Sequence, residues 1–80
     1  MKLTFWDRNN EERLIGIYPT EKEALLEIKR FLRNHYFKAH YYKITNFHDK
    51  KVYDVGSWSE FFVLYDNDDE PLNTRGVWEE

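Results

Sequence analysis

Four carboxylates lie close together near the C-terminus, at Asp66, Asp68, Asp69 and Glu70. Clustered carboxylates can imitate the phosphates of a nucleic acid and occupy a basic groove on another protein. Trp78 follows in the same segment, and a tryptophan in a charged terminus either packs on its own domain or anchors a partner. These five residues are therefore our candidate partner-binding site. A tail that only keeps the protein in solution is the other interpretation of the same pattern.

A second group of residues with binding chemistry lies in the basic segment 29–51, which holds seven basic residues, one acidic residue and all three histidines. Aromatic residues alternate there with basic ones, as in platforms for single-stranded nucleic acid. The alternative nucleic-acid-binding residues are Lys38, His40, Tyr42 and Lys43. The glycine-bearing aromatic signature of an RNA-recognition motif is absent. Packing of the same rings in the core is the favoured interpretation, ahead of contact with nucleic acid or with another protein.

Neither the histidines nor the carboxylates form a metal motif. Eight residues of strand between His40 and His48 would place them roughly 27 Å apart, and a third ligand with metal-site spacing is missing. The series Asp66-x-Asp68-x-Glu70 begins like a calcium loop, but Pro71 occupies the position that requires glycine. We expect no metal site and no cofactor.

The sequence also lacks a recognisable catalytic constellation. Ser57 and Ser59 are outside any G-x-S-x-G motif, and a glycine-rich phosphate loop is absent. Asp54 and Glu60 have no evident catalytic partner in the sequence. We therefore predict that the protein is not an enzyme.

The composition is that of one small domain. Eighty residues include six Phe, six Tyr, three Trp and no Cys, so most rings must serve as core in place of disulfides. The absence of cysteine fits a reducing compartment. The longest apolar run covers residues 61–65, which is too short for a signal peptide or a membrane span. We expect a cytoplasmic protein without membrane contact.

The net charge of −3 is unevenly distributed. Residues 1–28 hold four basic and six acidic residues, whereas residues 52–80 hold one basic and eight acidic residues. With the basic segment 29–51 between them, the chain has separate positive and negative regions, which indicates charged binding surfaces.

Local patterns predict one helix and five strands. Thr20 and Glu23 form a capping box, and apolar residues at helical spacing follow, so a helix is expected from Thr20 to about Asn34. Alternating or continuous apolar stretches predict strands at 3–6, 13–18, 40–47, 52–56 and 61–65, with a polar turn at 48–51.

The element order β-β-α-β-β-β indicates an α+β fold, with an antiparallel sheet of four or five strands and the helix on one face. The other face should be partly solvated. We place a single domain at residues 1–65 and an acidic, partly irregular and partly mobile tail at residues 66–80.

Several short motifs resemble a group of small uncharacterised accessory proteins of phages and mobile elements of Gram-positive bacteria. The resemblance covers residues 3–65 and rests on Gly16-x-Tyr18-x-Thr20, Glu23-Ala24, Phe31-Leu32, Phe37-Lys38, Tyr41-Tyr42, Asp54-x-Gly56-Ser57 and Phe61-Phe62. It carries over no catalytic residue. Small acidic proteins of such elements often disarm host defence, including CRISPR nucleases and restriction enzymes, and this association implies an anti-CRISPR-like role.

Three functions remain open at this point. The first is a phage-type inhibitor that binds a host defence nuclease by acidic mimicry of nucleic acid. The second is an accessory protein that binds nucleic acid through the basic segment 29–51. The third is a structural protein that forms a homodimer through a sheet edge or an aromatic face.

Overall fold

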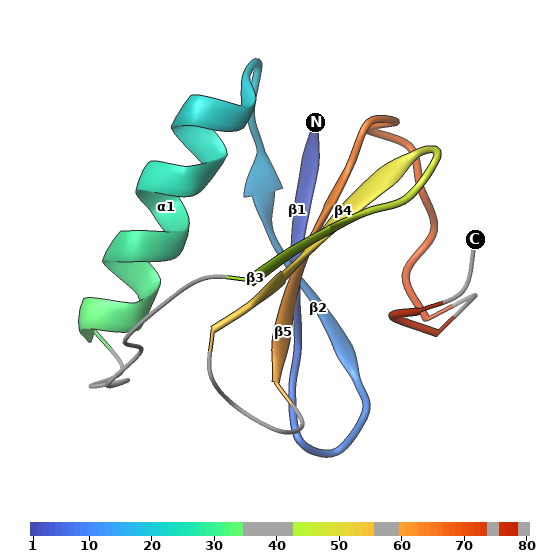
Figure 1. Cartoon of the computed structure of the whole chain (residues 1–80), viewed down its shortest axis with the longest axis horizontal. Helices are drawn as coiled ribbons and strands as arrows, with labels where there is room; N and C mark the ends of the chain where they lie inside the picture. The colour runs from blue at the N-terminus through green and yellow to red at the C-terminus, as the bar shows by residue number, and fades with distance from the viewer. Residues whose placement is uncertain (35–42, 56–59, 74–75, 79–80) are drawn as a thin grey trace.

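A computed structural model describes residues 1–34, 43–55, 60–73 and 76–78. The prediction of an α+β fold is confirmed, with one helix and a five-stranded antiparallel sheet (Figure 1). The elements are β1 (Lys2–Trp6), β2 (Glu12–Ile17), α1 (Glu21–Asn34), β3 (Lys43–Asn46), β4 (Lys50–Asp54) and β5 (Phe61–Tyr65). Among the described residues, no helix is long and apolar enough to cross a membrane, since α1 has 14 residues and many of them are polar.

The strands lie in the order β2-β1-β5-β4-β3, and all neighbours are antiparallel. The predicted N-terminal hairpin is confirmed as the pair β1–β2. Its register shifts at one point, because Leu3 faces Gly16 whereas Thr4 faces Leu14. Ile15 is therefore the extra residue of a β-bulge, which bends an edge strand.

The helix begins where its capping residue predicts. The hydroxyl of Thr20 accepts a hydrogen bond from the Glu23 N–H at 3.3 Å, and the Ala24 N–H donates to the Thr20 carbonyl at 3.2 Å. Acidic Glu21 and Glu23 lie in the first turn and Arg33 in the last, which complements the helix dipole.

The apolar stripe of α1 packs onto one face of the sheet, and the two together form the larger core cluster. Its buried residues are Leu3, Phe5, Ala24, Ile28, Leu32, Tyr53, Val55, Phe62 and Leu64.

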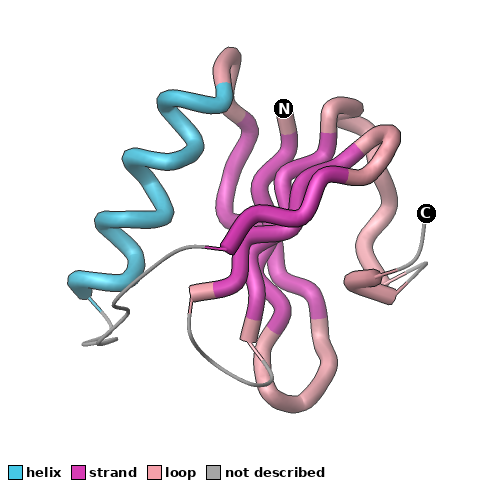
Figure 2. The backbone as a smooth tube through the Cα atoms, in the orientation of Figure 1, coloured by secondary structure: helices cyan, strands magenta, loops and turns pink. Residues whose placement is uncertain are grey.

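The segment after β5 covers the central strands on the second face of the sheet, whereas Leu14 of the edge strand β2, which pairs with Thr4 on that face, is 51% exposed, so the face is partly solvated. Figure 2 shows α1 on one side of the strands and this C-terminal segment on the other. Trp6, Val52, Val63 and Tyr65 are buried beneath it together with Val77. Side chains alternate between the faces of a strand, so β1, β4 and β5 each supply both cores.

A polar contact joins the first turn of α1 to β4. Lys51 Nζ donates to Glu21 Oε2 at 2.6 Å, and the Tyr53 hydroxyl donates to Glu21 Oε1 at 3.2 Å. The hydrogen bond from Lys51 lowers the pKa of the Glu21 carboxyl below its ordinary value. Burial, reinforced by the Glu21 charge, raises the pKa of the Tyr53 hydroxyl far above its ordinary value.

Replacing Glu21 by glutamine should therefore change how stability depends on pH. A carboxylate whose folded-state pKa is lowered stabilises the protein above its unfolded-state pKa, and this contribution is lost as the pH falls through the folded-state pKa. Glu21 and Lys51 are each about one-third exposed, so solvent weakens their attraction. We therefore expect the free energy of unfolding of the wild type to exceed that of Glu21→Gln by about 0.5 kcal/mol at pH 7. The difference should shrink as the pH drops below the ordinary value of 4.5. Urea denaturation at pH 7, 5 and 3 measures it.

The matched control is Glu11→Gln, at an exposed residue of the β1–β2 loop. It removes the same charge without the contact to β4, so its unfolding free energy should follow the wild type at all three pH values. Equal losses in the two variants would show that the Glu21 contact does not stabilise the fold.

Candidate partner-binding site

The four predicted carboxylates lie together in one turn, residues 66–70, directly after β5. We call these residues the acidic turn. Asp66, Asp68 and Asp69 are exposed, and Glu70 is half-buried. The turn therefore presents a local concentration of negative charge at one end of the sheet.

Hydrogen bonds within the acidic turn fix its shape. The Asn67 side chain accepts from the Asp69 N–H at 2.9 Å, and the Glu70 N–H donates to the Asn67 carbonyl at 3.3 Å. The Asp66 N–H donates to the Asp49 carbonyl in the neighbouring β3–β4 turn at 3.0 Å. These bonds order the backbone that carries the carboxylates.

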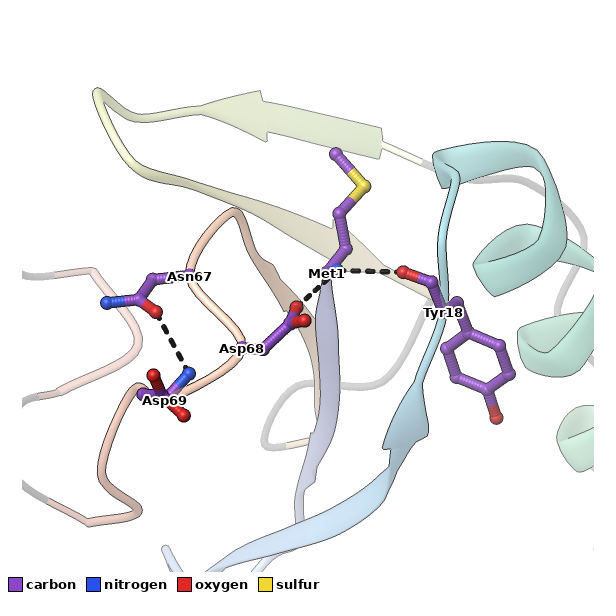
Figure 3. A network of polar contacts seen from close by, with 5 residues as sticks. All are labelled: Met1, Tyr18, Asn67, Asp68 and Asp69. Carbon is purple, nitrogen blue, oxygen red and sulfur yellow. Dashed lines mark hydrogen bonds and ion pairs between the residues drawn. The ribbon is translucent and has the colours of Figure 1, made fainter.

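The acidic turn is also joined to the start of the chain (Figure 3). The Met1 ammonium group donates to Asp68 Oδ1 at 2.5 Å and to the Tyr18 carbonyl at 2.7 Å. Lys2 Nζ donates to the Glu70 carbonyl at 2.6 Å. Asp68 therefore shares its charge with a cation, and Asp66 and Asp69 are the carboxylates of the turn best placed to meet a partner.

In the part of the chain that the structure describes, no group of three or more His, Cys, Asp or Glu side chains could hold a metal ion. Exposed carboxylates at this spacing instead provide an electrostatic surface for basic side chains.

Trp78, the fifth predicted residue, lies apart from the acidic turn. Its ring and the Phe61 ring pack edge to face, with 5.2 Å between their centroids, and the centroid of the Phe47 ring lies 6.3 Å away. Phe61 is the first residue of β5, whereas the acidic turn follows the last residue of that strand. Trp78 thus docks on its own domain, yet 51% of it remains exposed.

An open pocket of about 360 Å³ lies beside Trp78. Its lining comes from the end of β1, the β1–β2 loop, the start of β5 and the C-terminal segment: Trp6, Asp7, Arg8, Asn10, Phe61, Gly76, Val77 and Trp78. Sequence reasoning had included Trp78 but not the pocket, because these segments are far apart in the chain.

The loop wall of the pocket is held in place by Asp7. Its Oδ1 accepts from the Asn9 N–H at 2.9 Å and from the Glu11 N–H at 3.1 Å, and its Oδ2 lies 3.3 Å from the Arg13 guanidinium. Asn10 adopts a left-handed conformation with φ of 62°, which asparagine tolerates well in turns. The pocket therefore has an ordered wall.

The alternative nucleic-acid-binding residues are only partly placed. Lys43 is exposed at the start of the edge strand β3. Lys38, His40 and Tyr42 lie outside the described residues. Of this set, the structure therefore describes Lys43 alone.

A buried polar network attaches the C-terminal segment to the sheet, and sequence reasoning missed it. Glu12 is 5% exposed, and its Oε2 accepts from the hydroxyls of Thr4 at 2.6 Å and Tyr65 at 2.7 Å. Asn73 pairs with Glu12 twice, since its N–H donates to Glu12 Oε1 at 2.9 Å and its Oδ1 accepts from the Glu12 N–H at 2.8 Å. A threonine between two apolar residues of β1 was the only sequence signal, and it fits a solvated face equally well.

Lys50 makes a second attachment. Its side chain is almost fully buried, donates to the Gly76 carbonyl at 3.1 Å, and lies 5.1 Å from the Phe47 ring centroid. The sequence-based expectation that residues 48–51 form a polar turn is therefore wrong at its end, because β4 begins at Lys50. The C-terminal segment thus supplies an acceptor to this buried ammonium group, which favours its burial.

Comparisons with known proteins give no match to this chain, whether with protein-family models, curated proteins or solved structures.

Proposed function

We propose that this protein is a non-enzymatic inhibitor that binds a host defence nuclease, as anti-CRISPR proteins do, and blocks its nucleic-acid groove by acidic mimicry. The observation that carries the proposal is the ordered acidic turn, in which Asp66 and Asp69 are exposed on a backbone held by hydrogen bonds. An ordered surface loses less conformational entropy on binding than a mobile tail would.

The charge pattern supports a basic partner surface. Residues 66–70 contain four acidic and no basic residues, so the turn attracts the Lys and Arg side chains that line nucleic-acid grooves. Such attraction is screened by salt, with a Debye length of about 10 Å at 0.1 M. The complex should therefore weaken as the salt concentration rises.

The identity of the target class rests on the resemblance to phage and mobile-element proteins rather than on the geometry. A nuclease is nevertheless a physically consistent target, because its substrate groove has the charge that the acidic turn complements.

The double variant Asp66→Asn/Asp69→Asn tests the proposal. It removes two charges with little change in side-chain shape. DNA cleavage should be measured for a guide-loaded Cas9-type effector and for a restriction endonuclease, each with increasing amounts of the protein. The wild type should inhibit at least one of them, and the double variant should require at least tenfold more protein for the same inhibition.

Glu11→Gln/Glu23→Gln is the matched control, because it removes two exposed charges outside the acidic turn. It should inhibit as the wild type does. Equal inhibition by the Asp66→Asn/Asp69→Asn variant would contradict the proposal. A mobility shift of single-stranded DNA or RNA by the protein alone would instead favour the alternative function through the basic segment 29–51.

A further inference from the structure

The two edges of the sheet differ in how far they are protected from pairing with another strand. The edge strand β2 has a β-bulge at Ile15, and a bulge twists an edge away from further pairing. The other edge strand, β3, keeps an unbroken register with β4 from Lys43 to Asn46, and it is the last strand on its side of the sheet among the described residues. We infer that β3 pairs with β3 of a second copy of this chain, so that the two sheets join into one antiparallel sheet.

The turn between β3 and β4 shows which backbone groups of β3 point outward. The Phe47 N–H donates to the Lys50 carbonyl at 2.9 Å, so these two residues form a hydrogen-bonded pair. In an antiparallel ladder, such pairs alternate with pairs that do not bond to each other. Thr45, two residues before Phe47, therefore bonds to β4, whereas the N–H and C=O groups of Ile44 and Asn46 point away from it.

The opposite side of β4 gives the same alternation independently. The Asp66 N–H donates to the Asp49 carbonyl at 3.0 Å, in continuation of the β4–β5 register. Counting along the strand from this pair, Lys51 and Tyr53 bond to β5, which leaves Val52 to bond to β3. Both sides of β4 thus agree on the outward groups of β3.

A single register of β3 against its copy uses both outward residues within the strand. Residues that exchange hydrogen bonds must each point toward the other strand, so Ile44 pairs with Asn46 of the second copy, and Asn46 pairs with Ile44 of the second copy. Thr45 then lies opposite Thr45 of the second copy, at the two-fold axis, as a pair without mutual hydrogen bonds. The backbone alternation therefore specifies the geometry of the dimer.

The side chains of β3 are compatible with self-pairing in this register. Exposed Lys43 lies opposite Phe47 of the second copy, so the two lysines do not face each other. Ile44 is 45% exposed in one copy, and the neighbouring strand would cover part of its apolar surface. The threonines at the axis form a cross-strand pair of a kind that stabilises sheets. A second copy therefore meets the requirements of this edge in both its backbone and its side chains.

Cysteine cross-linking of the full chain tests the register, because the chain has no cysteine of its own. Thr45→Cys would place two thiols opposite each other, with Cα atoms about 4.5 Å apart, which is within reach of a disulfide. Mild oxidation should convert this variant to a disulfide-linked dimer on a non-reducing gel. Lys43→Cys is the matched control on the same face of β3. Its two copies would be offset by roughly 14 Å along the strands, so it should cross-link roughly tenfold more slowly.

A proline at an outward position tests the backbone hydrogen bonds. Asn46→Pro removes an N–H that points away from β4, and proline is tolerated at such positions of an edge strand, so the fold should remain. In analytical ultracentrifugation, the average mass of the wild type should rise with protein concentration from 9.9 kDa toward twice that value. Asn46→Pro should raise the dissociation constant roughly tenfold or more. Asn46→Ala keeps the N–H and should associate as the wild type does.

Other outcomes would overturn the inference. Equal cross-linking of Thr45→Cys and Lys43→Cys would mean that the thiols meet only by random collision. A wild type that stays monomeric at every concentration would leave the edge to a strand of another protein, and equal association of Asn46→Pro and wild type would place the contact elsewhere. If Asn46→Pro does not fold, the cross-linking rates decide, since Thr45→Cys keeps every backbone hydrogen bond. These experiments need no nuclease, so their failure would leave the proposed function untouched.

Discussion

A chain that ends at Tyr65 should lose its cooperative fold, although all five strands and the helix remain in it. Truncation removes Val77, whose burial contributes about 1.5–3 kcal/mol, and exposes apolar surface of Trp6, Val52 and Val63. It also removes the Gly76 carbonyl that accepts from buried Lys50. Together, these changes should lower the free energy of unfolding by about 4 kcal/mol or more.

That loss is large for a protein of this size. At 0.05–0.15 kcal/mol per residue, an 80-residue domain has a total unfolding free energy of about 4–12 kcal/mol. The truncated chain should show a broad or absent thermal transition by circular dichroism, together with increased binding of a hydrophobic dye. A milder change, Asp69→Asn, alters the acidic turn without removing the cover of the sheet and should melt like the wild type.

A sharp two-state transition of the 1–65 chain at the wild-type temperature would contradict this prediction. It would mean that residues 66–80 are an appendage and that the domain is complete without them. The same experiment thus decides whether the division between residues 65 and 66 separates a domain from a tail.

Glu12→Ala should have the second largest effect, with a loss of about 3 kcal/mol in the free energy of unfolding. The substitution removes the carboxylate that accepts from the hydroxyls of Thr4 and Tyr65 and from the N–H of Asn73. The Thr4 hydroxyl then has the Val63 carbonyl, at 3.4 Å. An unpaired buried polar group costs about 1–3 kcal/mol, although the three costs are not additive and water can enter the space. Urea denaturation of the full-length variant measures the loss.

Two smaller changes test the cause of that loss. Tyr65→Phe removes one donor and leaves the Glu12 carboxylate with its other partners, so it should cost about 1 kcal/mol. Asn73→Gly keeps the left-handed conformation, φ of 61°, but removes the side-chain acceptor, and should cost a similar amount. If Glu12→Ala cost no more than either of these, the buried network would not be what holds the C-terminal segment on the sheet.

The stability and binding predictions are connected through the same segment. Residues 66–78 supply the acidic turn, the cover of the second sheet face and one wall of the pocket. A variant that releases this segment should therefore also lose inhibition. For this reason the inhibition variants proposed above are confined to exposed side chains.

The sequence by itself determined the elements of this protein, because their signals are local. The Thr20 cap and the apolar stripe that follows specify a helix within one or two turns of chain, and β5 was predicted with the bounds that it has. The clustering of Asp66, Asp68, Asp69 and Glu70 in one turn also follows from their adjacency. Contacts between residues that are close in sequence can be predicted without knowing the fold.

Only the tertiary structure decided what covers the second face of the sheet and where Trp78 lies. The pairing of Glu12 with Asn73 and the contact of Lys50 with Gly76 join residues that no local pattern relates. A polar segment without apolar periodicity gives no sign that it is ordered, since its order comes from partners on distant strands. The acidic segment was predicted as a partly irregular and partly mobile tail for this reason, and its described residues add Val77 to the second core cluster and line the pocket.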